Sequence, residues 1–190
     1  MKIGLFFGSY NPIHTGHLVI ANYMANYTIL NQVWLVVSPH NPLKTKSDLI
    51  NVYDRLEMAK LAIEGSTKIK VSDIELKLSQ PSYTIDTLTY LQEKYPEHEF
   101  TLIMGADNLA SLHKWKNFEQ ILNYYSILVY PRPGIDLTNW NQNKSIVITN
   151  APLMELSSTF IRKNIKEKNN VQYFLPEKVL EFIERKSLYQ

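Results

Sequence analysis

Short apolar runs alternate with helical patterns along almost the whole chain, and this alternation constrains the fold more than any other feature. The runs that indicate strands are 3–7, 33–37, 69–71, 100–104, 127–130 and 146–148. Several are continuously apolar, as expected for strands that are buried on both faces. The patterns with helical spacing are 17–27, 51–64, 84–95, 157–168 and 176–186. The alternation predicts an α/β fold, a Rossmann-like, doubly wound parallel sheet of five to six strands with helices on both faces.

The length of 190 residues predicts a single domain over 1–190, because a typical domain has about 150 residues. A small C-terminal helical part, about 157–190, is expected to pack on it. A hydrophobic fraction of 45% and a charged fraction of 20% exclude a disordered chain, a collagen-like chain and a coiled coil. The formal net charge of +2 argues against a nucleic-acid partner, so any basic site must be local.

The chain contains no Cys, which excludes disulfide scaffolds, thiolate zinc sites and Cys nucleophiles. The apolar run at the start is too short for a signal peptide and has no small-residue cleavage site after it. No stretch approaches the roughly 18 apolar residues of a membrane span. We therefore expect a cytoplasmic protein that does not bind membranes.

The turn after the first strand, from Gly8 to His17, is the first candidate site. It lacks both the Gly-Lys-Ser/Thr of a P-loop and the dinucleotide glycine fingerprint. It places His14 and His17 at the start of a helix, where free backbone N–H groups attract phosphate. Imidazoles there can donate hydrogen bonds to phosphoryl oxygens, and Gly8 and Gly16 let the backbone approach a ligand closely. Capping of the helix and a metal site are the alternatives, although no carboxylate lies nearby in the sequence.

This turn resembles the H-x-G-H signature of a nucleotidyltransferase superfamily, in which both histidines bind ATP phosphates and stabilise the pentacoordinate transition state. The resemblance implies that His14 and His17 are catalytic. The resemblance also implies that four other residues of this turn bind ATP: Gly8, Ser9, Tyr10 and Gly16. The positions at which the sequence departs from the family pattern of Thr, Phe and Asp are Ser9, Tyr10 and Asn11.

A second phosphate-binding segment is predicted from Leu156 to Arg162. It resembles the superfamily signature Ile-Ser-Ser-Thr-x-Ile-Arg at six of seven positions. Ser is a favourable N-cap, and Ser158 and Arg162 are four residues apart on one helix face. The resemblance implies that this helix start holds the β- and γ-phosphates, with Arg162 catalytic. It assigns ATP binding to Ser157, Ser158 and Thr159. A capped helix with a solvated arginine is the alternative.

Lys44 follows the second predicted strand in a loop with two prolines. By resemblance it is the phosphate lysine of the superfamily, and we count it as catalytic. Many relatives carry His immediately before this basic residue, whereas Leu43 is found here. A solvated loop lysine is the alternative, and the resemblance gives His40 no role.

Three further segments resemble nicotinate-nucleotide adenylyltransferases: 81–88, 104–108 with Trp115, and 131–134. This resemblance implies that five residues bind nicotinate mononucleotide: Tyr83, Thr84, Asp107, Trp115 and Arg132. Trp115 can stack on a pyridine ring, and Thr84 with nearby backbone N–H groups can donate to its carboxylate. Asp107 can accept hydrogen bonds from ribose hydroxyls. The alternatives are that Trp115 packs in the protein and that Thr84 and Asp107 cap helices.

The resemblance implies adenylyl transfer from ATP to nicotinate mononucleotide, giving deamido-NAD and pyrophosphate. Mg²⁺ is expected to accompany ATP, held mostly by the nucleotide and water, with no metal site formed by the protein. The alternatives are another acceptor (nicotinamide mononucleotide, phosphopantetheine or FMN) and a non-catalytic nucleotide sensor. A homo-oligomer is possible. The sequence leaves open the ratio of acid to amide preference.

Overall fold

Six parallel strands form one sheet in the computed structural model, which describes residues 1–39, 49–140 and 142–190. The strands are β1 (Lys2–Gly8), β2 (Gln32–Val37), β3 (Ile69–Ser72), β4 (Glu99–Gly105), β5 (Ser126–Tyr130) and β6 (Ile146–Ile148). Their order in the sheet is β3-β2-β1-β4-β5-β6, and every neighbouring pair is parallel. This is the strand order of the doubly wound dinucleotide-binding fold. The predicted fold class is therefore confirmed.

The helices connect these strands and follow the last one. They are α1 (Thr15–Tyr27), α2 (Val52–Ala62), α3 (Thr84–Lys94), α4 (Ala106–Ala110), α5 (Phe118–Tyr124), α6 (Ser158–Lys166) and α7 (Glu177–Arg185). The sequence analysis did not predict α4 and α5, which both lie between β4 and β5. Helices of five and seven residues span two turns or fewer, so they leave almost no periodic signal in the sequence.

Two hydrophobic cores cover the two faces of the sheet. One core contains buried residues of α1, α2, α6 and α7 together with Val33, Leu35 and Val37 of β2. The other contains buried residues of α3, α4 and α5 and draws on alternate residues of the same strands, such as Val36. Successive strand residues point to opposite faces, so one apolar strand supplies both cores. This explains why the strand sequences are continuously apolar.

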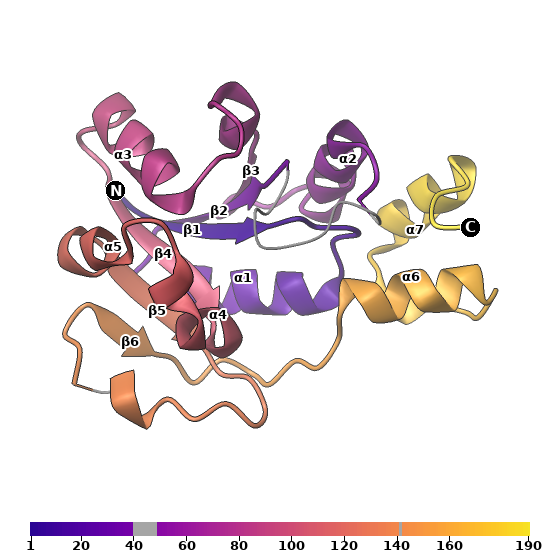
Figure 1. Ribbon diagram of the computed structural model, residues 1–190. Helices are drawn as coiled ribbons and strands as arrows, with labels where there is room; N and C mark the ends of the chain where they lie inside the picture. The colour runs from indigo at the N-terminus through magenta and orange to yellow at the C-terminus, as the bar shows by residue number, and fades with distance from the viewer. Residues whose placement is uncertain (40–48, 141) are drawn as a thin grey trace.

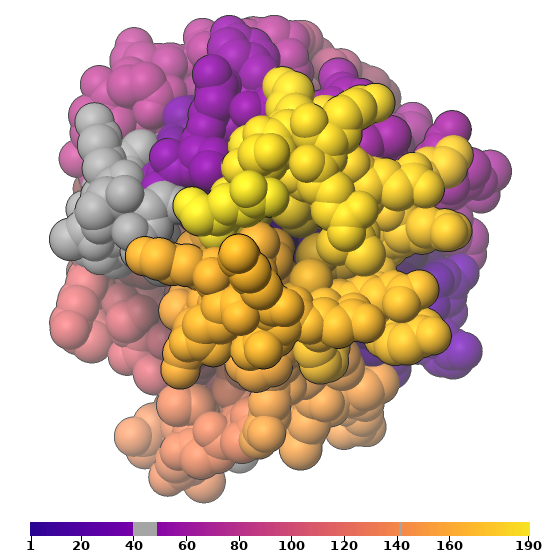
Figure 2. Space-filling view, turned by 90° about the vertical axis from the view of Figure 1, so that its right-hand side faces the viewer, coloured from indigo at the N-terminus to yellow at the C-terminus, as the bar shows by residue number. Residues whose placement is uncertain are grey.

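The order of the strands reverses at β1, which lies between β2 and β4. Ligands of open α/β sheets bind beyond the carboxyl ends of the strands at such a reversal. Figure 1 shows α6 and α7 beyond the carboxyl end of β1, and Figure 2 shows both helices on the face of the molecule at that end. Chain segments distant in sequence are thus brought to the predicted site. In the described part of the chain, no helix is long and apolar enough to cross a membrane.

Candidate active site

The two histidines of the first turn lie at the start of α1, and their rings stack on each other. The ring centroids are 3.7 Å apart and the planes are inclined by 30°. The backbone N–H of His14 donates a hydrogen bond to Nδ1 of His17, at 3.2 Å. Because Nδ1 of His17 accepts this bond, a neutral His17 ring carries its proton on Nε2. The histidines thus cap the helix, which was the predicted alternative. The same hydrogen bond orients the His17 ring so that its Nε2 can donate.

His14 is the more buried of the pair, with 4% of its surface exposed. Burial lowers the pKa of His14 to about 4, and the positive charge of Arg132 contributes a smaller effect in the same direction. His14 is therefore neutral at pH 7. Its Nδ1 is buried and has no hydrogen-bond partner among the described residues. An unsatisfied buried nitrogen is costly, so a ligand that satisfies it would gain affinity.

Tyr10 folds back over the end of β1. Its backbone has a φ of 48°, its surface is 2% exposed, and its hydroxyl donates to the carbonyl of Phe6 at 2.6 Å. Its ring meets the ring of His17 edge-on, with 5.0 Å between centroids. A Cβ atom at Gly8 would lie only 2.8 Å from the Tyr10 ring, so this packing requires glycine there. The ring of Tyr10, which packs over Gly8, thus supports the ring of His17. This packing role is separate from the predicted binding of a nucleotide by Tyr10 and Gly8.

Gly16 makes a similar close approach: a Cβ atom there would lie 3.0 Å from Nδ1 of His14, so the His14 ring would have to shift to admit it. Ser9, the remaining residue of this turn that was predicted to bind ATP, is partly exposed, and its carbonyl accepts a hydrogen bond from Arg55. The first turn therefore brings its predicted ATP-binding residues together at the end of β1. Lys44, the lysine predicted to bind phosphate, lies outside the described residues.

The start of α6 is capped as the sequence predicted. Ser157 occupies the N-cap position, and its Oγ accepts a hydrogen bond from the backbone N–H of Phe160 at 3.2 Å. Arg162 lies one turn into the helix, and its Nη2 approaches Oγ1 of Thr159 to 3.4 Å. Hydroxyl groups and a guanidinium group thus gather at one helix start, as an anion site requires.

The same helix is tied directly to the first turn. Oγ of Ser158 donates to the carbonyl of Pro12 at 2.8 Å, and Nη1 of Arg162 donates to the carbonyl of Asn11 at 3.0 Å. These bonds join segments that are 146 and 151 residues apart in the sequence. The two predicted signatures therefore form one site.

Arg132 links the ends of β4 and β5 to the segment before α6. Its Nη1 donates to the carbonyl of Met154 at 2.6 Å, its Nε lies 3.7 Å from Oδ1 of Asp107, and its guanidinium lies over the ring of Tyr130. Asp107 is exposed and lies in the first turn of α4, not at its N-cap, so the predicted capping role is not observed. The positive charge of Arg132 also acts on His14, whose pKa it helps to lower.

The remaining predicted residues lie at the start of α3 and before α5. Tyr83 holds the N-cap position of α3 and Thr84 is its first helical residue, so Thr84 is not the cap. Nζ of Lys116 lies 4.7 Å from the centroid of the Tyr83 ring and 2.9 Å from a carboxylate oxygen of Asp86. The adjacent Trp115 is half-buried against the second core. Lys116 thus joins the two segments, although from the sequence alone it could not be distinguished from a solvated lysine.

Sequence reasoning missed two further groups at this site. Arg55 of α2 is 1% exposed and bonds to loop carbonyls, whereas the sequence suggested only packing or surface. The hydroxyl of Tyr189 donates to Oδ1 of Asn11 at 2.9 Å. One signal was available for Arg55: it shares the apolar face of its helix with Leu56 and Ala59. Nothing in the sequence indicated Tyr189.

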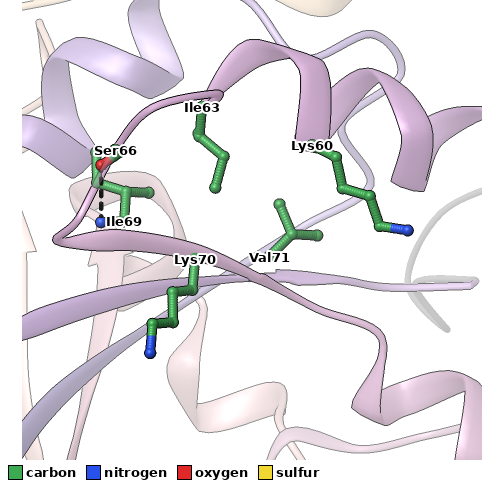
Figure 3. Close-up of a pocket in the computed structure, with 6 residues that line it drawn as sticks. All are labelled: Lys60, Ile63, Ser66, Ile69, Lys70 and Val71. Carbon is green, nitrogen blue, oxygen red and sulfur yellow. Dashed lines mark hydrogen bonds between the residues drawn. The ribbon is translucent and has the colours of Figure 1, made fainter.

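A separate hollow of about 400 Å³ lies between the end of α2 and β3, at one edge of the sheet. Figure 3 shows its lining residues, Lys60, Ile63, Ser66, Ile69, Lys70 and Val71. Oγ of Ser66 is already engaged by the backbone N–H of Ile69 at 3.0 Å. None of the residues predicted to bind nucleotide lines this hollow, and it carries no further argument.

A doubly wound sheet with paired histidines after β1 and a hydroxyl-rich helix start bonded to the same turn defines a nucleotidyltransferase. Residues 5–164 match the cytidylyltransferase-like family. Two relatives, each named "Probable nicotinate-nucleotide adenylyltransferase", come from Flavobacterium johnsoniae and Flavobacterium psychrophilum. They are 56% and 55% identical to this chain, and each alignment covers all of both proteins. The chain therefore belongs to the family of nicotinate-nucleotide adenylyltransferases, as its motifs predicted.

The fold is similar to that of a solved nicotinic acid mononucleotide adenylyltransferase from Plasmodium falciparum, which is complexed with NaAD. The TM-score is 0.84 over 99% of this chain and 97% of the other, at 20% sequence identity. A putative nicotinate-nucleotide adenylyltransferase from Vibrio parahaemolyticus gives a TM-score of 0.75 over 99% of this chain and 94% of the other, at 22% identity. At such low identity, these two similarities establish the fold.

Proposed function

We infer that the protein transfers the adenylyl group of ATP to nicotinate mononucleotide in NAD biosynthesis, releasing pyrophosphate and forming deamido-NAD. The observation that carries the inference is the pair of hydrogen bonds from Ser158 and Arg162 to the first turn. These bonds bring the two signatures together, and we infer that together they form one anion site. The nature of the acceptor follows from the names of the full-length relatives.

The proposed reaction is an in-line attack of the 5′-phosphate of nicotinate mononucleotide on the α-phosphorus of ATP. No covalent enzyme intermediate is needed, because positioning and charge stabilisation suffice for such a transfer. His17 donates from Nε2 to the transferring phosphoryl group, where negative charge develops. His14, neutral at pH 7, contributes a hydrogen bond and not a charge. Arg162 and the hydroxyls at the start of α6 hold the leaving pyrophosphate, assisted by Lys44.

The acceptor binds where the ends of β4 and β5 and the start of α3 meet. Trp115 stacks on the pyridine ring, and Thr84 with the free N–H groups at the start of α3 receives the carboxylate. Asp107 accepts hydrogen bonds from the ribose, and Arg132 orients Asp107 and faces the acceptor phosphate. The 3.7 Å approach of Arg132 to Asp107 supports this arrangement.

Mg²⁺ is proposed to enter with ATP. The site is built from imidazoles, hydroxyls, N–H groups and guanidinium groups, which suit phosphate oxygens and not a cation. Within residues 1–39, 49–140 and 142–190, no group of three or more His, Asp or Glu side chains is placed to hold a metal ion. We propose that the ion is held by the phosphates and water, and that it neutralises charge on the leaving group.

The test is pyrophosphate release on mixing the protein with ATP, Mg²⁺ and one candidate acceptor at a time. We expect rapid release with nicotinate mononucleotide and slow release with nicotinamide mononucleotide. Faster turnover of nicotinamide mononucleotide, phosphopantetheine or FMN would assign a different acceptor. ATP binding without pyrophosphate release from any acceptor would identify a nucleotide sensor.

A further inference from the structure

Among the described residues, Arg55 is the only arginine with one of the largest fully buried side chains, and its guanidinium joins segments at the carboxyl end of the sheet. Nη1 donates to the carbonyl of Ser9 at 2.6 Å and to the carbonyl of Ser38 at 2.7 Å. Nη2 donates to the carbonyl of Pro39 at 2.8 Å, and Nε donates to that of Ile50 at 3.2 Å. One side chain thus bonds to the loop after β1, the loop after β2 and the segment that leads into α2.

The charge of this guanidinium is not neutralised by a carboxylate from the described residues. All four of its acceptors are backbone carbonyls. Burial lowers the pKa of Arg55, which reflects the cost of removing a cation from water. An apolar residue at this position of α2 would fill the core without that cost. The arginine is therefore retained for the bonds that it makes.

Arg55 joins two segments at the carboxyl end of the sheet. Ser9 begins the turn that leads to His14 and His17, which are predicted to bind phosphate, and Ser38 and Pro39 follow β2. The backbone N–H of Ser38 also donates to the carbonyl of Gly8 at 2.9 Å, which extends the pairing of the two strands up to the guanidinium. A shift of the guanidinium would move Ser9 relative to Ser38 and Pro39.

We propose that Arg55 is a positioning residue for ATP, which sets the spacing between the histidine turn and Ser38–Pro39 at the end of β2. It touches no substrate, and it acts through the backbone carbonyls that it holds. The proposal rests on the proposed function, because it takes the histidine turn to bind the phosphates of ATP. A misplacement of about 1 Å at reacting groups can lower a rate by about a hundredfold.

The test compares Arg55→Lys, which keeps the positive charge, with Arg55→Gln, which removes it. Lysine cannot form the fork that reaches three carbonyls at once. We expect both variants to lower kcat/KM for ATP by about tenfold to a hundredfold. The KM for nicotinate mononucleotide should change by less than about threefold, because its predicted contacts lie on other segments. The dissociation constant of ATP, measured by calorimetry without acceptor, should rise in both variants.

Met58→Ala is the matched control, because Met58 is fully buried on the same helix and bonds to neither loop. It should lower the unfolding temperature while leaving the dissociation constant of ATP unchanged. An Arg55→Lys protein that binds ATP as tightly as the wild type would overturn the proposal and assign Arg55 a role in charge alone. If Arg55→Lys does not fold, unchanged ATP binding by folded Arg55→Gln overturns it equally. The calorimetric measurement needs no acceptor, so it separates a failure of this proposal from a wrong acceptor.

Discussion

The two halves of the proposed site, one for the phosphates of ATP and one for the acceptor, are built differently. In the phosphate half, the histidine turn and the start of α6 are joined by direct hydrogen bonds, and His14 is 4% exposed. In the acceptor half, the principal links are an ion pair of Lys116 with Asp86 and the approach of Arg132 to Asp107, all between partly exposed side chains. Exposed ion pairs contribute little stability, typically below about 1 kcal/mol.

The difference indicates which part of the site requires accurately oriented groups. Phosphoryl chemistry is common to the whole superfamily and depends on groups that are already oriented before the substrate arrives. The acceptor half needs only to recognise a ring, a ribose and a carboxylate, so it can rely on side chains at a more exposed edge. Substitutions in the phosphate half should therefore affect kcat, and those in the acceptor half should affect selectivity.

The largest effect is expected for His17→Ala. Because Nε2 of His17 donates where charge develops, kcat and kcat/KM should fall together by roughly 10²–10³. Steady-state kinetics on a variant with an unchanged circular dichroism spectrum is the measurement. Turnover close to that of the wild type would show that His17 has no catalytic role. It would also contradict the difference between the two halves of the site.

Arg162 tests the bond between α6 and the first turn. Loss of a charged hydrogen bond costs about 1.5–3 kcal/mol, so kcat/KM for ATP should fall by roughly tenfold to a hundredfold in Arg162→Ala. Arg162→Lys should not restore it, because lysine cannot reproduce the fork of donors. An unaffected response to ATP in Arg162→Ala would make Arg162 a solvated helix residue.

His14 gives the phosphate half a dependence of stability on pH. The unfolded chain protonates this residue at its ordinary pKa of 6.5, whereas the folded protein does so only near 4. Between these values the unfolded state binds more protons, so the free energy of unfolding falls as the pH is lowered through this window. From pH 7.5 to 5, His14 should account for a loss of about 2 kcal/mol.

Urea denaturation at the two pH values measures this loss, and His14→Asn should show about 2 kcal/mol less of it than the wild type. The matched control is His113→Asn, since His113 is exposed and lies outside the histidine pair. Equal pH dependence in the wild type and His14→Asn would show that His14 is not held neutral.

The smallest effect is expected for Thr84→Val. Donors with no acceptor suit the carboxylate of nicotinate and leave the amide group of nicotinamide unpaired, at about 1–3 kcal/mol for each such group. The wild type should therefore prefer the acid by roughly tenfold to a few hundredfold, and Thr84→Val should lower this ratio several-fold while ATP affinity is retained. An unchanged ratio in the variant would leave Thr84 as a structural residue of α3.

Much of this molecule could be predicted from its sequence, because the strands are continuously apolar and the longer helices have clear periodicity. The two phosphate signatures were recognisable because each has a fixed spacing within one short segment: His14 and His17 in the first turn, and Ser158 and Arg162 in α6. The short helices α4 and α5 were missed because tertiary packing, and not periodicity, forms them. For Arg55 the sequence indicated at most a position on the apolar face of its helix, because its partners are backbone carbonyls, which no residue type in the sequence marks.

The ring of Tyr10 over Gly8 couples two positions of this turn. An alanine at position 8 would collide with the ring, and a smaller residue at position 10 would remove one of the two aromatic rings that meet His17 edge-on. The two positions are therefore epistatic: in this chain a larger residue becomes admissible at 8 only after the aromatic ring at 10 has been lost. The cost of that first substitution falls on His17, which loses part of its packing.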